Sequence, residues 1–205
     1  MPVPTTGQRV IARRLHKDEV LSRLRDAILD GLLQPGERIR DRDLEVWFGV
    51  SRTPIRLAIA ALEDMRLVET SPSRYTKVCG LRPEIVPDLV DGMTVLWGAA
   101  LDRVRTLGRL GDVEASLVSS GTVFESWARG EAAAIEVVRT FAGATAAAAT
   151  LSVNPVLERF ADRAVVLVLF HATRSGAQVD AEALADSLRR ASRHVLSPEQ
   201  GSTAA

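Results

Sequence analysis

The stretch GVSRTPIRLAI, residues 49–59, opens with a glycine and a serine and then carries two arginines, Arg52 and Arg56. Ser51 belongs to the residue types that commonly precede the first turn of a helix. The apolar residues that follow have the spacing of a buried helical stripe: Ile55, Ala58, Ile59 and Leu62. Residues four apart share a helical face. The sequence therefore predicts a helix that begins after Ser51 and presents both arginines away from its buried stripe.

The segments on either side predict a compact unit around this helix. Apolar periodicity predicts helices over 18–33 and 41–49, with Asp41 as the N-cap of the second and Gly49 as the residue that ends it. Two short extended pieces around SPSR, residues 71–74, predict a hairpin. The predicted order is helix, helix, tight turn, helix and hairpin.

The second and third helices form a predicted helix-turn-helix, and the start of its recognition helix is the part that enters the DNA major groove. The guanidinium groups of Arg52 and Arg56 suit this position because each can bond O6 and N7 of one guanine. Other side chains near the helix starts suit phosphate oxygens: Ser51, Thr53, Arg40 and Arg42. Spacing alone leaves an alternative open, an amphipathic helix with two solvated arginines.

Composition narrows the class of protein. The 205 residues are 46% hydrophobic and 25% charged, which is typical of a globular protein. Residues 1–82 hold 15 Lys and Arg against 11 Asp and Glu, whereas residues 83–205 hold 11 against 15. A basic front half is the electrostatic footprint of a polyanionic partner. With one cysteine, no apolar signal core and no aliphatic run long enough for a bilayer, we expect a cytoplasmic protein without a membrane role.

The second half of the chain reads as helical throughout. Helical patterns cover five segments: 84–108, 112–129, 131–152, 154–173 and 180–195. Two prolines within 81–87 mark the expected boundary with the first half. An all-helical bundle follows. No phosphate-binding loop, GxSxG pattern or paired catalytic residues stand out, so we expect no enzyme.

The segment AILDGLLQPGERIRDRDLEVWFGVSRTPIRLAIAALEDMRLV, residues 27–68, resembles the winged helix-turn-helix head of the GntR family of bacterial transcription regulators. The resemblance extends over about residues 18–78 and is nearly letter-perfect in GVSRTPIR. In that family DNA is contacted by an arginine near the start of the second helix and by two arginines of the recognition helix. These positions correspond to Arg42, Arg52 and Arg56, with Thr53 also near the DNA.

The wing departs from the family pattern. Tyr75 in PSRYTKV stands where the family often has glycine, and Arg66 stands at the position of a turn glycine. The resemblance implies wing contacts with DNA from three residues: Ser73, Arg74 and Lys77.

Within the family, an all-helical second domain is similar to the FadR-like subgroup, also called the FCD class. FCD domains commonly bind a metal through one aspartate and three histidines. The aspartate position here is Val138 and the first histidine position is Ala142, while His171 and His194 compare with the last two ligands. Two imidazoles without an acid make a poor closed site, so we expect neither a metal nor another cofactor.

Together these observations predict a mainly α protein, with an N-terminal winged helix-turn-helix and a C-terminal all-helical bundle. The expected divisions are a flexible arm over 1–14, a DNA-binding domain over 15–80, a helical domain over 81–196 and a disordered tail over 197–205. We expect a dimer that binds an inverted-repeat operator in double-stranded DNA, with a small-molecule effector in the helical domain. The alternative is a constitutive dimeric DNA-binding protein whose helical domain only pairs the subunits.

Overall fold

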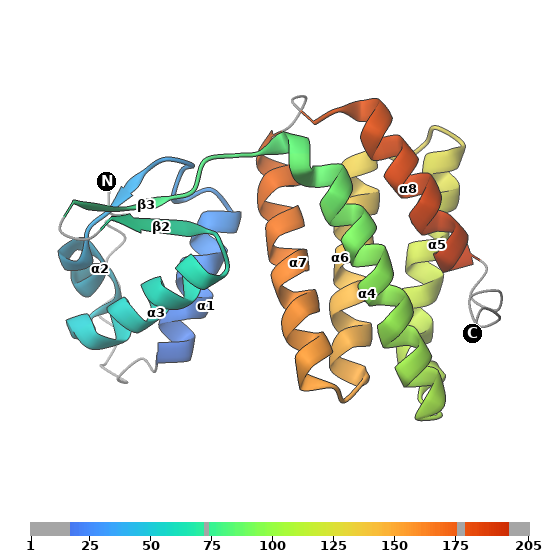
Figure 1. The fold of residues 1–205 in the computed structure, drawn as a ribbon, viewed down its shortest axis with the longest axis horizontal. Helices are drawn as coiled ribbons and strands as arrows, with labels where there is room; N and C mark the ends of the chain where they lie inside the picture. Colours follow the sequence, from blue (N-terminus) through green and yellow to red (C-terminus); the bar gives the residue numbers. More distant parts are fainter. Residues whose placement is uncertain (1–16, 72–73, 176–178, 197–205) are drawn as a thin grey trace. The chain divides into compact units, whose positions relative to one another are not determined.

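The computed structural model of the chain describes residues 17–71, 74–175 and 179–196 (Figure 1). The chain folds into two units, the first of which ends at Leu81 and the second of which begins at Arg82. The arm expected over 1–14 and the tail expected over 197–205 lie outside the described residues. The protein is mainly helical, with one small sheet in the first unit, as the sequence predicts.

The first unit contains three helices and three strands. They are α1 (Lys17–Leu29), β1 (Arg38–Ile39), α2 (Asp41–Phe48), α3 (Arg52–Asp64), β2 (Val68–Ser71) and β3 (Tyr75–Val78). The predicted stripe of α3 is buried and α1 packs against this helix through its own apolar face. Leu24 and Ile28 of α1 and Leu44 of α2 are fully buried. The burial of these side chains fixes the orientation of α3 within the unit.

The sheet is antiparallel, with the strand order β1-β3-β2. The hairpin of β2 and β3 is confirmed, whereas β1 is a strand that the sequence does not predict. A two-residue strand is too short to show the alternation that marks a longer one. Ile39 nevertheless lies opposite Thr76 of β3 and buries its side chain in the unit.

The start of α2 differs from the sequence-based expectation. Asp41 is not the N-cap, because Arg40 occupies that position in an extended conformation and makes no side-chain capping bond. Asp41 is the first helical residue. Instead of capping its own helix, its carboxylate accepts a hydrogen bond from Arg52 of α3 and forms an ion pair with Arg56. Gly49 ends α2 in the left-handed conformation, as predicted, with φ +64°.

The second unit is a helical bundle. Its elements are η1 (Pro83–Ile85), α4 (Val86–Thr106), η2 (Leu110–Val113), α5 (Glu114–Ala128), α6 (Ala134–Leu151), α7 (Pro155–Ser175) and α8 (Ala181–Leu196). Helix α4 packs against α6, α7 and α8, and α5 packs against α6. The expected boundary prolines, Pro83 and Pro87, lie in the first turns of η1 and α4, where a missing N–H is tolerated.

Aromatic side chains occupy the centre of the bundle. The ring of Phe141 packs edge-on against Trp97 at 5.8 Å and against Phe124 at 5.7 Å between ring centroids. All three side chains are almost completely buried. In the described part of the chain, one helix, α6, is long and apolar enough to cross a membrane by length and composition. Its buried side chains face α4 and α7, as in the core helix of a bundle.

Candidate nucleic-acid interface

Two arginines project from the exposed side of α3. Arg52 and Arg56 lie one turn apart, and their side chains are 65% and 68% exposed. The orientation of the helix face that carries them is fixed, because Ile55 and Ile59 of the same helix are buried in the core of the unit. The first turns of α3 therefore present two cationic side chains from a rigid support, as base reading in a groove requires.

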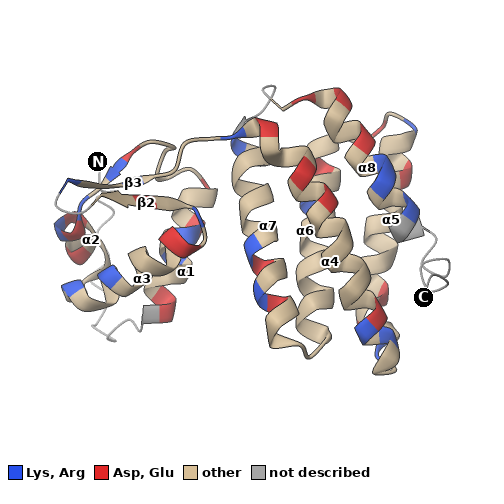
Figure 2. Ribbon diagram, viewed as in Figure 1, with Lys and Arg blue, Asp and Glu red and all other residues tan. Residues whose placement is uncertain are grey.

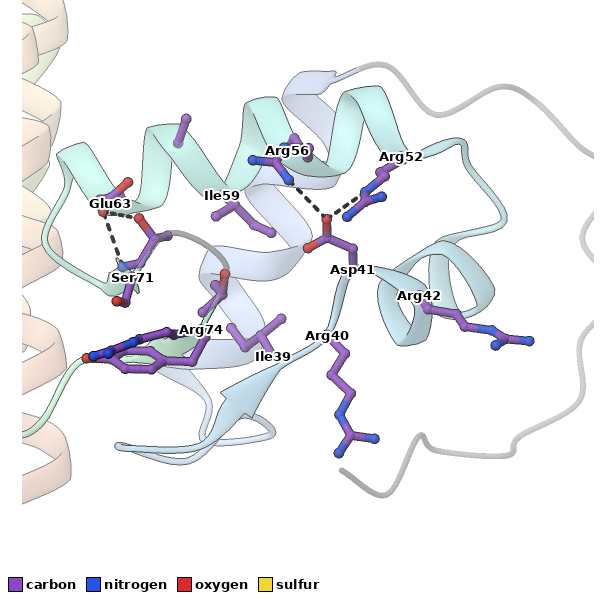
Figure 3. A pocket seen from close by; sticks show the side chains of 14 residues that line it. Ile39, Arg40, Asp41, Arg42, Arg52, Arg56, Ile59, Glu63, Ser71 and Arg74 are labelled. Atoms are coloured by element: carbon purple, nitrogen blue, oxygen red, sulfur yellow. Dashed lines mark hydrogen bonds and ion pairs between the residues drawn. The ribbon is translucent and has the colours of Figure 1, made fainter.

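Both arginines converge on one carboxylate oxygen of α2. Nε of Arg52 donates to Oδ2 of Asp41 at 2.9 Å, and Nη1 of Arg56 lies 3.6 Å from the same oxygen (Figure 3). The side chain of Asp41 is only 19% exposed. The sequence does not indicate this role of Asp41, since the residue lies eleven positions before Arg52 and the contact depends on the angle between two helices.

The arginines border an open hollow of about 510 Å³ between α2, α3 and the sheet. Its lining contains five arginines and two acids: Arg40, Arg42, Arg52, Arg56, Arg74, Asp41 and Glu63. The carboxylate of Glu63 accepts hydrogen bonds from both the backbone N–H and the hydroxyl of Thr70. Arg40 and Arg42 point away from Asp41 in Figure 3. The lining therefore offers cationic groups to a polyanion on more than one side.

The two hydroxyl residues at the start of α3 are sequence neighbours of Arg52, but they do not line the hollow. Ser51 and Thr53 are both exposed. Ser51 occupies the N-cap position of α3, as predicted, but its side chain makes no capping bond. Its hydroxyl is therefore not committed to the helix end and can meet a phosphate oxygen.

The predicted wing residues differ from one another in placement. Ser73 lies outside the described residues. Arg74 is exposed and lines the hollow with the arginines of α2 and α3. Lys77 instead pairs with Glu69 of the neighbouring strand at 2.6 Å and lies 5.1 Å from the Tyr75 ring centroid. The hydrogen bond to Glu69 raises the pKa of the Lys77 ammonium.

The arrangement of α2, a left-handed glycine turn and an arginine-bearing α3 backed by a hairpin is that of a winged helix-turn-helix. Residues 16–78 match the family model of the bacterial regulatory proteins of the gntR family. Residues 16–78 are thus similar to the DNA-binding domain of the gntR family. The match covers the arginines of α2 and α3 and the whole β2–β3 hairpin.

Two curated relatives of this chain are described as helix-turn-helix-type transcriptional regulators. The regulator Rv0494 of Mycobacterium tuberculosis is 33% identical over 165 residues, which are 78% of this chain and 62% of the relative. A regulator of Agrobacterium vitis, from an intergenic region, is 30% identical over 81 residues, which are 40% of this chain and 47% of the relative. The chain thus spans about half to three fifths of the length of these relatives.

A solved structure has a similar fold over most of the chain. It is a transcriptional regulator described as GntR from Rhodococcus sp. RHA1, with a TM-score of 0.55 and 23% sequence identity. The similarity covers 88% of this chain and 91% of that chain. The similarity thus extends beyond residues 16–78 into the helical second unit, and it is a similarity of fold.

In the helical unit, apolar residues stand at two positions where FCD domains commonly have metal ligands. Val138 and Ala142 of α6 are fully buried and carry no donor atom. His171 of α7 is 3% exposed, and its Nδ1 accepts a hydrogen bond from the backbone N–H of Arg82 at 3.0 Å. Burial and the charge of Arg82 lower the pKa of His171. Among the described residues, no three His, Cys, Asp or Glu side chains gather as a metal site would need.

Proposed function

We infer that this protein is a dimeric transcription regulator that recognises an inverted-repeat operator through Arg52 and Arg56. The observation that carries the proposal is the shared carboxylate of Asp41, which accepts a hydrogen bond from Arg52 and forms an ion pair with Arg56 at the exposed start of α3. A side chain restrained before binding loses less conformational freedom when it meets a base. A bidentate arginine then selects guanine at its position.

The remaining cationic and hydroxyl groups supply contacts that do not depend on sequence. Arg40, Arg42 and Arg74 border the same hollow, and Ser51 and Thr53 lie exposed at the start of α3. Such groups bind phosphate and set the position of the protein on the duplex. We assign Arg42 to a phosphate or to a base at the edge of the site. Ser73 and Lys77 stay in the proposed interface as wing residues.

One helix-turn-helix reads only a few base pairs, so two heads are needed for a specific site. A two-fold dimer places equivalent heads on half-sites of opposite orientation. The proposed operator is for this reason an inverted repeat, and the proposed location is the cytoplasm, at the nucleoid.

The helical unit is proposed to be a divergent FCD domain that modulates operator affinity by binding a small molecule. Nε1 of Trp97 is buried without a hydrogen-bond partner in the described part of the chain. A buried donor of this kind favours a ligand that carries a hydrogen-bond acceptor on a largely apolar body. The apolar residues Val138 and Ala142 favour the same uncharged ligand chemistry.

The alternative is a constitutive dimeric DNA-binding protein whose helical unit has no ligand. The close packing of Trp97, Phe124 and Phe141 at the centre of the bundle favours this alternative. Thermal-shift screening of the full chain separates the two, because a ligand that binds only the native state raises the melting temperature. A reproducible shift with an apolar hydrogen-bond acceptor supports regulation by an effector.

The DNA-binding proposal is tested by selecting bound duplexes from a random pool with the full-length protein. The expected result is one motif in two inverted copies, with guanines at fixed positions in each half-site. Footprinting of the selected site should protect both halves together. A pool without enrichment, or a single unrepeated half-site bound by a monomer, would overturn the proposal.

A further inference from the structure

One face of α4 is left uncovered by the bundle. The opposite side of this helix packs against α6, α7 and α8. The uncovered face contains Gly92, Val95 and Ala99, all of them exposed. The side chain of Val95 is 72% exposed, and a Cβ added at Gly92 would meet no atom within 4 Å. This face therefore presents a narrow apolar stripe with small residues on both sides of one valine.

Charged residues of opposite sign mark the two ends of this stripe. Asp88 and Arg103 are exposed, and neither has an ion-pair partner within the residues that the structure describes. The other acids of α4 are engaged, since Asp91 pairs with Arg190 and Asp102 with Arg105. Figure 2 shows acids alone toward the start of α4, and arginines together with an acid toward its end.

The pattern on this face is symmetric about a point between residues 95 and 96. Gly92 and Ala99 are equally distant from this point, and so are Asp88 and Arg103. The intervals follow the four-and-three spacing that keeps residues on one side of a helix. At about 1.5 Å of rise per residue, the two charges lie about 22 Å apart along the axis.

We propose that this face of α4 pairs with the same face of a second copy of the chain. The inference rests on the proposed dimer and names the surface that forms it. In an antiparallel pair centred on Val95, Asp88 of each copy meets Arg103 of the other copy. Gly92 then lies opposite Ala99 of the other copy, and their small side chains allow the two helices to approach closely. A two-fold axis makes each of these contacts twice.

A second exposed apolar cluster, Val156 and Phe160 of α7, fits a second copy less well. Phe160 is 61% exposed. The two acids beside this cluster already have partners, because Glu158 accepts a hydrogen bond from Thr150 and Asp162 is engaged as well. The cluster therefore has no free pair of opposite charges at its two ends, and it serves as the control surface.

The test reverses one charge at a time and measures the dimer dissociation constant of the full chain by sedimentation equilibrium. Asp88→Arg leaves two cations to face each other across the interface, and Arg103→Asp leaves two acids. Each single variant should weaken the dimer by about tenfold or more. The double variant D88R/R103D should restore it. An equimolar mixture of the two single variants should form a heterodimer, because the reversed position of each then meets an opposite charge.

Matched apolar variants locate the surface independently. Val95→Asp should weaken the dimer, whereas Phe160→Asp should leave it unchanged, with unchanged helical content and melting temperature in both. Dissociation by Phe160→Asp, or no recovery in the double variant and the mixture, would overturn the assignment of the surface. A dimer that none of these variants weakens would overturn it too, while leaving the proposed dimeric regulator intact. A wild-type monomer that protects single half-sites would instead overturn the proposed function.

Discussion

Nε of Arg52 donates to Oδ2 of Asp41 at 2.9 Å, and this bond joins the recognition helix to the first turn of the helix before it. The arginine side chain is mostly exposed, whereas the aspartate is mostly buried. An exposed ion pair adds little to folding, typically below about 1 kcal/mol. Its larger effect is on orientation, since it restrains the guanidinium group where the groove of DNA would meet it.

Replacing Arg52 tests base recognition directly. Arg52→Ala should weaken binding to the selected operator by about 1–3 kcal/mol and relax base preference at one position in each half-site. Arg52→Lys is the control, because it keeps the charge but lacks the planar fork that bonds O6 and N7 together. Binding is measured by fluorescence anisotropy on operators with each base at that position. Unchanged affinity and preference in Arg52→Ala would remove this residue from base reading.

Replacing Asp41 separates orientation from charge. Asp41→Ala removes the carboxylate that Arg52 and Arg56 both contact and also removes one negative charge beside the proposed phosphate contacts. Binding to random duplex should become tighter, because net positive charge drives nonspecific binding. The preference for the operator over random duplex should fall by an amount on the order of 1 kcal/mol.

Asp43→Ala is the matched control, since it removes the same charge from the same helical turn and Asp43 does not border the arginine hollow. It should tighten nonspecific binding without changing the preference for the operator. Equal loss of preference in both variants would show that Asp41 acts through charge alone.

The helices that carry the candidate site could be predicted from the sequence because their signals are local. The stripe through Ile55 and Leu62 predicted α3, and the glycine at 49 predicted the turn before it. The relation of Arg52 to Asp41 could not be predicted, because it depends on how two helices cross. Aspartate before an apolar run also has a familiar local meaning, that of an N-cap, and Asp41 does not have this role.

Backbone conformation provides a test of stability in the first unit. Arg66 follows α3 with φ +61°, and in this left-handed region residues other than glycine are strained. Arg66→Gly should raise the free energy of unfolding by about 1 kcal/mol, the relief of strain exceeding the extra freedom of the unfolded chain. Gly49→Ala should have the opposite effect, with a loss of about 1–2 kcal/mol, because Gly49 has φ +64°. An added Cβ would meet no atom within 4 Å, so this loss would come from the backbone conformation alone. Urea unfolding of the full chain, followed by circular dichroism, measures both. A stability loss in Arg66→Gly would contradict this account.

The buried imidazole of the second unit should make stability depend on pH. His171 accepts a hydrogen bond at Nδ1, and burial lowers its pKa from the ordinary value of 6.5. The unfolded chain therefore binds the proton more readily than the folded chain does. The contribution of the neutral imidazole is complete above pH 6.5 and is lost progressively as the pH falls below that value.

Between about pH 7 and about pH 5.5, the wild-type chain should lose more stability than His171→Asn. The amide oxygen of asparagine can accept the same N–H but does not titrate, so the variant isolates the proton from the hydrogen bond. Urea unfolding at several pH values measures the difference. Parallel curves for the two proteins would show that His171 titrates alike in the folded and unfolded chains.

We predict that the helical unit holds neither a structural nor a regulatory metal ion. Val138 and Ala142 cannot donate to a cation, and they stand where the resembled domains have an aspartate and a histidine. Nδ1 of His171 is already an acceptor for the N–H of Arg82, which leaves only Nε2 of this ring for a metal. Elemental analysis of protein purified without chelator and without a metal-affinity tag should find zinc, nickel and manganese far below one equivalent per chain. About one equivalent of any of them, lost in His171→Ala, would show that a different set of ligands has replaced the familiar one.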